Sequence, residues 1–345
     1  MVLTSSFFFS GCSSDSEEYK APKFKNETHL AFDLIGEELL CAPSNILATD
    51  NYVLVSGYSS PGGATFFVFD KDGNPIRSGI NYGRGPAETI SGYINMAYYD
   101  GRVQYNDLQT GERLSFSLDN FLDDSTLDVE KELLDLPGWC TYYMQTPNGD
   151  KLTVISLSAS KDPELPQRTI ILESSGNTYE FTEPVIEDRE IAFFYSLQKS
   201  IAFSPNGESM VFSGTPGTIF EFFSLKDGIE RLCIKRILPP SVTLSNGSYR
   251  QNDDYIFGSG KLCTTDSFVY SAYDGKHTAR EWRASNNACL LYNNIAVFDW
   301  KGNPKDLYTT DYRIMCLSVE NDSTVFACLE DIEGRIFIGK AKLMQ

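Results

Sequence analysis

The chain has 345 residues and a formal net charge of -18 at pH 7. This charge excludes a conventional nucleic-acid-binding protein, because it repels phosphate backbones and leaves no basic stripe. It also argues against electrostatic docking of the protein on an anionic leaflet. The 23 Phe and 19 Tyr residues favour strands, and helix-forming runs are scarce, so the composition indicates an all-β protein.

The first segment of the chain is an apolar run, Val2–Phe9, that leads through Ser10 and Gly11 to Cys12. An apolar stretch that ends in small residues is typical of a secretory signal. The tetrapeptide Phe-Ser-Gly-Cys resembles the lipobox of bacterial lipoproteins, although phenylalanine stands where leucine is usual. The resemblance implies a signal peptide over residues 1–11 and acyl chains on Cys12. The alternative is a frayed N-terminal strand that ends in an ordinary cysteine.

Serine and acidic residues follow at once, from Ser13 to Glu18. A polar stretch of this kind cannot bury apolar surface and is interpreted as a flexible tether over residues 12–27. Each buried CH₂ of an acyl chain contributes ~0.8 kcal/mol to membrane binding. The expected location is therefore the outer membrane, with the membrane bound through the lipid anchor and the protein exposed on the cell surface. The periplasmic face is the alternative location.

The rest of the chain repeats short turn sequences. The segment "VFDKDGNP" at 68–75 recurs as "VFDWKGNP" at 297–304, and "QTPNGDKL" at 145–152 recurs as "FSPNGESM" at 203–210. Asx-Gly and Lys-Gly pairs between β-rich runs are typical of tight hairpins. Candidate innermost strands recur about every 48 to 60 residues, the length of a four-stranded propeller blade with its loops. They begin near Ile46, Ile94, Tyr142, Ile201, Lys261 and Ile314.

These signals predict a six-bladed β-propeller with four-stranded blades over residues 28–345. Only three strands are predicted after Tyr312, so the apolar stretch Leu30–Ile35 is expected to supply the fourth and to remove the exposed edge. The segment Leu118–Leu136 fits either a helix or an outer strand with a loop.

Two further segments resemble a known family. "SPNGESMVF" at 204–212 is similar to the Ser-Pro-Asp-Gly repeat of TolB-type propellers, with Asn206 in place of aspartate. "YGRGPAE" at 82–88 is similar to the Gly-x-Gly-Pro-Gly-Glu signature of six-bladed TolB-like propeller lipoproteins, with Ala87 in place of glycine. The resemblance covers roughly residues 28–343 and implies a location in the bacterial cell envelope and a propeller shape, and no particular chemistry.

Motifs for catalysis or metal binding are absent from the sequence. Gly83-Arg84-Gly85-Pro86 lacks the Lys-Ser/Thr of a P-loop and is interpreted as a connection between blades, in which the glycines supply positive φ and Pro86 fixes φ. Asp70-Lys71-Asp72-Gly73 lacks the later acids of an EF-hand and is interpreted as a hairpin turn. Only His29 and His277 are present, so we predict no catalytic residue, no cofactor and no metal site.

Most cysteines outside the N-terminus are expected to be buried thiols. Cys233, Cys289, Cys316 and Cys328 each lie in an apolar run, where a free thiol acts as a small hydrophobic side chain. A Cys316–Cys328 bridge across a hairpin is the alternative for that pair.

Candidate ligand contacts gather in the segment His277–Asn287, with Arg250–Tyr255 shortly before it. Arg280, Trp282 and Arg283 combine a stacking surface with bidentate donors, and both residue types are favoured at binding hot spots. Arg84 is a fourth candidate. The alternative is that the tryptophan packs against a blade and the arginines offset the acidity of the chain.

The function predicted from the sequence is that of a ligand-binding or scaffolding propeller, whose partner is a carbohydrate, a peptide or another envelope component. One alternative is a propeller enzyme acting on glycans with an Asp/Glu acid–base pair. Another is a periplasmic, TolB-like partner in envelope assembly.

Overall fold

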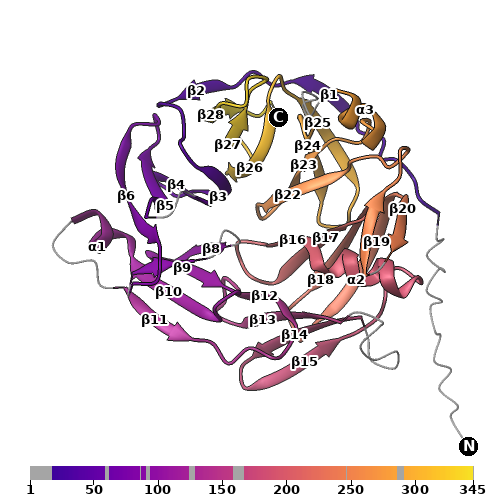
Figure 1. The fold of residues 1–345 in the computed structure, drawn as a ribbon, viewed down its shortest axis with the longest axis horizontal. Coiled ribbons are helices and arrows are strands. Elements are labelled where there is room, and N and C mark those ends of the chain that lie inside the picture. The colour runs from indigo at the N-terminus through magenta and orange to yellow at the C-terminus, as the bar shows by residue number, and fades with distance from the viewer. Residues whose placement is uncertain are drawn as a thin grey trace, which may run out of the picture.

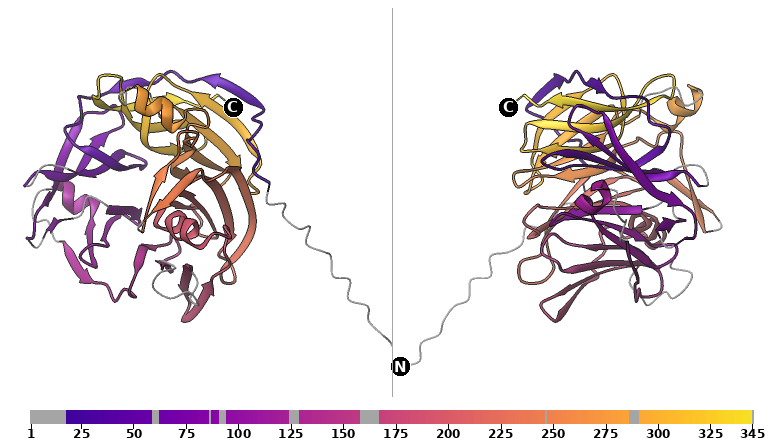
Figure 2. Two further views of the ribbon diagram at one scale, coloured as in Figure 1. Left: turned by 45° about the vertical axis from the view of Figure 1, so that its right-hand side comes forward. Right: turned by 90° about the vertical axis from the view of Figure 1, so that its left-hand side faces the viewer.

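Six mainly antiparallel sheets stand around a common axis, as seen down that axis in Figure 1 and from two further directions in Figure 2. The computed structural model describes residues 18–58, 62–85, 87–90, 94–123, 129–157, 167–245, 247–285 and 291–344. The predictions of an all-β fold and of six blades are confirmed. Cys12, the signal peptide, Pro86 and Cys289 lie outside the described residues.

The strands follow one another from the axis to the rim in each of the first four blades. Blade 1 contains β3 (Ala42–Ala48), β4 (Tyr52–Tyr58), β5 (Ala64–Asp70), β6 (Pro75–Tyr82) and the short β7 (Glu88–Thr89). Blade 2 contains β8 (Ile94–Tyr99), β9 (Arg102–Asp107), β10 (Glu112–Ser117) and β11 (Glu130–Leu133). Blade 3 contains β12 (Cys140–Gln145), β13 (Lys151–Ser156), β14 (Arg168–Ser174) and β15 (Asn177–Phe181). Blade 4 contains β16 (Gln198–Phe203), β17 (Ser209–Thr215), β18 (Thr218–Ser224) and β19 (Glu230–Leu238).

Blades 5 and 6 each receive an additional strand from the N-terminal segment. Blade 5 contains β22 (Ser259–Thr264), β23 (Phe268–Tyr273), β24 (Asn294–Asp299), β25 (Pro304–Thr309) and, at its rim, β1 (Asn26–His29). Blade 6 contains β26 (Arg313–Glu320), β27 (Thr324–Glu330), β28 (Ile336–Lys342) and, at its rim, β2 (Asp33–Ile35). All six predicted innermost strands are confirmed as β3, β8, β12, β16, β22 and β26.

The repeated turn sequence forms the same hairpin in blades 1 and 5. Asp70 Oδ1 accepts from the backbone N–H groups of Asp72 (2.9 Å) and Asn74 (2.8 Å). Asp299 Oδ1 accepts from the corresponding groups of Lys301 (3.0 Å) and Asn303 (2.9 Å). An Asp side chain that binds its own turn backbone stabilises a tight connection. The interpretation of the Asp70 motif as a hairpin turn is confirmed.

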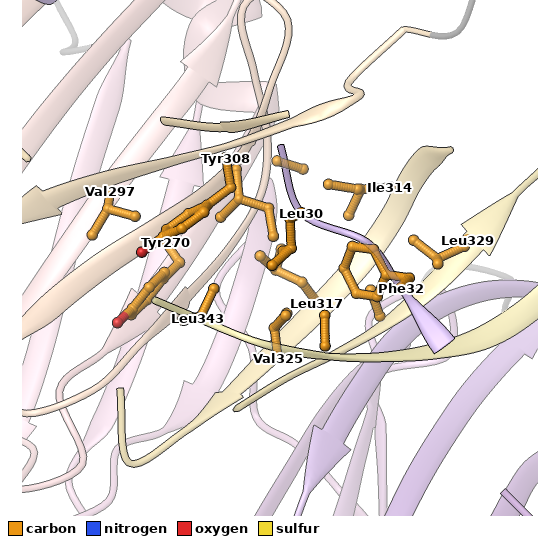
Figure 3. Close-up of a cluster of buried hydrophobic side chains, with 14 residues drawn as sticks. Leu30, Phe32, Tyr270, Val297, Tyr308, Ile314, Leu317, Val325, Leu329 and Leu343 are labelled. Atoms are coloured by element: carbon orange, nitrogen blue, oxygen red, sulfur yellow. The ribbon is translucent and has the colours of Figure 1, made fainter. Parts of the chain in front are cut away.

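The N-terminal strand closes the propeller as predicted. β2 pairs with β28 in the antiparallel direction, with Asp33 opposite Lys340. Figure 3 shows that Leu30 and Phe32 lie among core side chains of blades 5 and 6, such as Tyr308 and Leu317. Because both side chains are buried, the closing segment stabilises the structure through its core contacts as well as through strand pairing.

The sequence did not reveal that the N-terminal segment also adds a strand to blade 5. β1, which includes His29, pairs in the parallel direction with β25 and covers the outer edge of blade 5. Residues 18–27, which we assigned to the tether, also lie against the propeller. The Phe24 ring contacts the Phe298 ring edge to face at 5.8 Å between centroids, and the Lys20 N–H donates to Arg236 O (2.8 Å).

Two ambiguous features are resolved. The segment Leu118–Leu136 contains both alternatives, a short helix α1 (Leu118–Asp123) and the outer strand β11. Cys316 and Cys328 lie directly opposite one another in β26 and β27, and both are buried free thiols. Cys233 is half-buried, and its thiol donates to Lys301 O (3.4 Å).

Most inserted elements lie on one face of the disc, which we call the insert face. The innermost strands begin there, because each outermost strand returns the chain to the face at which the next blade starts. Helix α2 (Arg189–Leu197) precedes β16, the hairpin β20 (Val242–Ser245)–β21 (Ser248–Gln251) precedes β22, and α3 (Ala279–Ala284) joins β23 to β24. In the edge-on view of Figure 2, α3 projects from this side. None of the helices in the described parts of the chain is long and apolar enough to cross a membrane.

Candidate functional site

A cavity of about 590 Å³ runs along the axis of the propeller. All six innermost strands contribute to its wall, so it is a product of the closed ring and belongs to no single blade. Its volume falls within the range of about 300–1,000 Å³ that is typical of small-molecule sites.

Polar side chains encircle the cavity near the insert face. They are Ser44, Asn95, Thr141, Lys199 and Lys261, and each is the second or third residue of the innermost strand of a different blade. We call this set the mouth ring. Because equivalent positions of the innermost strands lie at the same height along the axis, residues that are far apart in sequence meet at one level.

Three members of the mouth ring lie at β-bulges. Ser44 is an extra residue between the pairs Pro43–Gly57 and Asn45–Ser56. Thr141 is the corresponding extra residue in β12, and Gly260 and Lys261 together oppose the single residue Ala272. A bulge bends the strand and redirects a side chain, and bulges occur frequently beside functional sites.

The charge of the cavity is opposite in sign to that of the whole chain. Lys199 and Lys261 line it, and the described lining residues include no Asp or Glu, although the chain has 47 acidic residues and 29 basic ones. A concave site with charge of one sign and low-dielectric walls concentrates counter-ions. The cavity is therefore suited to a ligand that carries negative charge.

Lys199 is held by blade 3 and by the end of α2. Its Nζ donates to Thr141 O (3.1 Å), Thr141 Oγ1 (2.8 Å) and Ser196 O (2.9 Å). A lysine ammonium group has three donors, so all of them are satisfied within the protein. Burial lowers the pKa of Lys199 to about 7, with the Arg168 guanidinium contributing in the same direction and the Cys140 thiol opposing it.

The pH dependence of stability tests this environment. In the unfolded chain Lys199 titrates near its ordinary pKa of 10.5, so between about pH 7 and pH 10 the unfolded state binds more protons than the folded state. The contribution of Lys199 to the free energy of unfolding should rise with pH across this window, so the slope should be more positive in the wild type than in Lys199→Met. Urea denaturation at pH 7, 8, 9 and 10 measures both slopes, and equal slopes would contradict the lowered pKa.

The loop at Arg84 corrects one expectation. It lies on the insert face, where blade 1 leads to blade 2, and Arg84 is exposed. Gly83 and Gly85 do not have positive φ, so that part of the prediction is wrong. A Cβ on Gly83 would lie 2.1 Å from Glu88 Oε2, and the Gly85 N–H donates to the same oxygen (2.5 Å). A Cβ at either glycine would displace the Glu88 carboxylate, around which the loop wraps.

The other predicted contacts also lie on the insert face, but the structure gives them partners within the chain. Arg283 Nη1 donates to Asp253 Oδ1 (2.6 Å) and Arg280 Nη2 to Asp253 Oδ2 (3.4 Å). The Trp282 ring packs edge to face on Phe257 at 5.7 Å between centroids. These contacts attach α3 to the segment after β21. The structure does not bring Arg84 together with these three residues, because it lies between blades 1 and 2.

His277 forms a pair that the sequence did not reveal. Its Nδ1 lies 2.8 Å from Oδ2 of the buried Asp274, whose Oδ1 accepts from the His277 backbone N–H (2.7 Å). The carboxylate therefore orients the ring and the turn that precedes α3. Among the described residues, no group of three His, Cys, Asp or Glu side chains is placed to hold a metal ion.

Comparison with known families agrees with this architecture. Residues 202–322, from the end of β16 to the hairpin of blade 6, match the family model described as TolB-like 6-blade propeller-like. Over this segment the chain is similar to TolB-like six-bladed propellers, and its fold is a six-bladed propeller. No curated protein matches its sequence.

Several solved structures resemble this propeller over nearly its whole length. A member of the duf4221 family from Bacteroides vulgatus has a TM-score of 0.54 at 8% identity, with 93% of this chain and 99% of that chain covered. A putative exported protein from Bacteroides fragilis has a TM-score of 0.53 at 12% identity, with 93% and 99% covered. The calcium-binding protein regucalcin from Agrobacterium tumefaciens has a TM-score of 0.50 at 12% identity, with 93% and 98% covered. At these identities the likeness shows the fold alone.

A buried ion network connects blades 3 and 4. Arg168 of blade 3 forms a bidentate pair with Glu221 of blade 4, with Nη2 to Oε2 at 2.9 Å. Arg231 Nη1 contacts the same Oε2 at 3.0 Å, and the Tyr195 hydroxyl of α2 donates to Oε1 (3.2 Å). Burial alone would raise the pKa of Glu221, but the Arg168 guanidinium and then Arg231 lower it. The network joins two blades and the helix beside the mouth ring.

Proposed function

We propose that this protein is a binding module of the cell envelope that takes a small ligand into its central cavity from the insert face. The observation that carries the proposal is the cavity of about 590 Å³, whose wall combines hydroxyl, amide and aromatic groups with two lysines. Sites of this size and mixed character are typical of small-molecule binding. The ligand is a carbohydrate or a peptide-like molecule from the envelope.

Support for an envelope location comes from the N-terminal sequence and from the family. The lipobox-like sequence before Cys12 predicts a lipid anchor, and the acidic stretch after it predicts display on the cell surface. The TolB-like match and the fold shared with an exported protein are consistent with an envelope location. Lipid attachment and surface exposure are predictions from the sequence.

The alternative of a glycan-cleaving enzyme needs two carboxyl groups about 5–9.5 Å apart in the pocket. The described residues that line the cavity include no Asp or Glu, so an acid–base pair for that chemistry would have to lie elsewhere. The cavity itself favours binding.

A substitution that fills the central cavity tests the proposal. Asn95 belongs to the mouth ring and is half-buried, whereas Thr178 lies exposed on the outer strand β15. We expect members of a panel of monosaccharides, sugar acids and short peptides to raise the melting temperature of the wild type, because saturation at 100 times Kd contributes about 2.7 kcal/mol. Asn95→Trp should abolish the shift, and Thr178→Trp should retain it.

Differential scanning fluorimetry measures these shifts, and native mass spectrometry counts the bound molecules. An unchanged shift in Asn95→Trp would place the ligand outside the cavity and contradict the proposal. The absence of a shift for every member of the panel would also contradict it.

A further inference from the structure

Lys261 is the channel lysine whose ammonium group has no hydrogen-bond or ion-pair partner among the described residues. It differs in this respect from Lys199, whose three donors all bind protein oxygens. The Lys261 side chain is exposed to the channel, so its donors point into the space that a ligand would occupy.

The backbone directs Lys261 into the channel. Gly260 and Lys261 oppose the single residue Ala272 across β22 and β23, and a bulge of this kind redirects the side chain that it carries. The next residue is held in place, because the Leu262 N–H donates to Ser200 Oγ of blade 4 (3.1 Å). The position of the lysine is therefore determined by two blades and does not depend on a mobile loop.

The surroundings leave the charge of Lys261 uncompensated. The described lining residues include no carboxylate, and desolvation lowers the pKa of Lys261, opposed only by the nearby Cys316 thiol. Because the side chain is exposed to the channel, a ligand can reach the ammonium group, and a bound anion would satisfy its donors through charge-assisted hydrogen bonds.

We propose that Lys261 is the recognition residue for a carboxylate group, so that the cavity selects small organic acids over their uncharged counterparts. This inference rests on the proposed function and adds the class of ligand to it. An acid ligand carries further polar groups, and the Asn95 amide at the same level of the mouth ring can donate a hydrogen bond to them. The acid is either that of a sugar or the C-terminus of a short peptide, and both share this chemistry.

Matched pairs of probes test the inference with the full chain. D-glucuronate is compared with D-glucose, and an acetylated tripeptide with its C-terminal amide, by isothermal titration calorimetry at low ionic strength. We expect one of the two acids to bind about 10- to 100-fold more tightly than its uncharged counterpart, the range of one charged hydrogen-bonded contact. Lys261→Met should remove this preference and leave the affinity for the uncharged probe unchanged. Lys261→Arg should restore it in part.

Lys226→Met is the matched control, since it removes one positive charge at an exposed turn on the opposite face. It should retain the wild-type preference. The inference is overturned if the preference survives in Lys261→Met, or if neither acid binds more tightly than its counterpart at millimolar concentrations. The proposed function would survive either result if an uncharged probe still binds and Asn95→Trp abolishes that binding, so the two failures are distinguishable.

Discussion

Replacing Glu221 with Gln should lower the free energy of unfolding by about 3–5 kcal/mol at pH 7, the usual cost of removing one partner of a buried ion pair. The side chain of Glu221 is fully buried and contacts both Arg168 and Arg231. Its removal leaves two positive charges facing each other in a site with little water. The glutamine amide can accept hydrogen bonds there but cannot neutralise the two guanidinium groups.

The full difference in unfolding free energy between the wild type and Glu221→Gln should be present at neutral pH. Because the folded pKa of Glu221 is lowered, the stabilisation is present above the ordinary pKa of glutamate and is lost only as the pH falls through the lower, folded value. Urea denaturation of the wild type and of Glu221→Gln at pH 7 measures the difference.

Glu183→Gln is a matched control in the same network. Glu183 Oε2 accepts from Arg231 Nη2 (2.9 Å), but its side chain is 71% exposed. Exposed ion pairs contribute about 0–1 kcal/mol, so this substitution should change stability by no more than that. Equal losses of unfolding free energy in Glu221→Gln and Glu183→Gln would show that burial does not determine how much each ion pair contributes to stability.

Deletion of residues 1–36 should have the second large effect, because it removes β1, β2 and two core side chains. Truncating a buried Leu or Phe costs about 2–5 kcal/mol, and the loss of both Leu30 and Phe32 approaches the total stability of about 5–15 kcal/mol of a typical protein. The deletion would also uncover the outer edges of β25 and β28. Uncovered edges pair with other chains, so we expect an unfolded or associated product.

Deletion of residues 1–17 is the control, since it leaves Lys20, Phe24 and both N-terminal strands in place. This variant should retain the wild-type melting temperature and elution volume. Circular dichroism and size-exclusion chromatography with light scattering measure both properties. A monomeric 1–36 deletion variant with an unchanged melting temperature would show that the N-terminal segment does not close the ring.

The sequence located the strands and turns because their signals are local. Asp70 and Asp299 organise identical turns with backbone groups only two and four residues away, so a short segment contains the whole interaction. The closing strand was also predictable, since the last blade lacked a strand and an apolar segment was available. The parallel pairing of β1 was not predictable, because it depends on the path of the segment across a second blade.

The candidate site was only partly predictable. Arg280, Trp282 and Arg283 stood out because of their residue types, and the structure places them in contacts that attach α3 to a neighbouring segment. Lys261 was placed in an innermost strand by the sequence, but no chemical role followed. The one signal that could have identified it was a lysine at a position expected to face the axis.

By itself the sequence determined the fold class, the number of blades and the manner of closure, because alternation and turn residues are read from contiguous residues. Lipid attachment at Cys12 remains a prediction from the lipobox-like tetrapeptide. Only the tertiary structure decided that Lys199 and Lys261 share one cavity whose described lining includes no carboxylate, and that Arg168 meets Glu221 across two blades. The physical reason is that closing the ring brings equivalent positions of different blades to one level. No local pattern shows which side chains meet there.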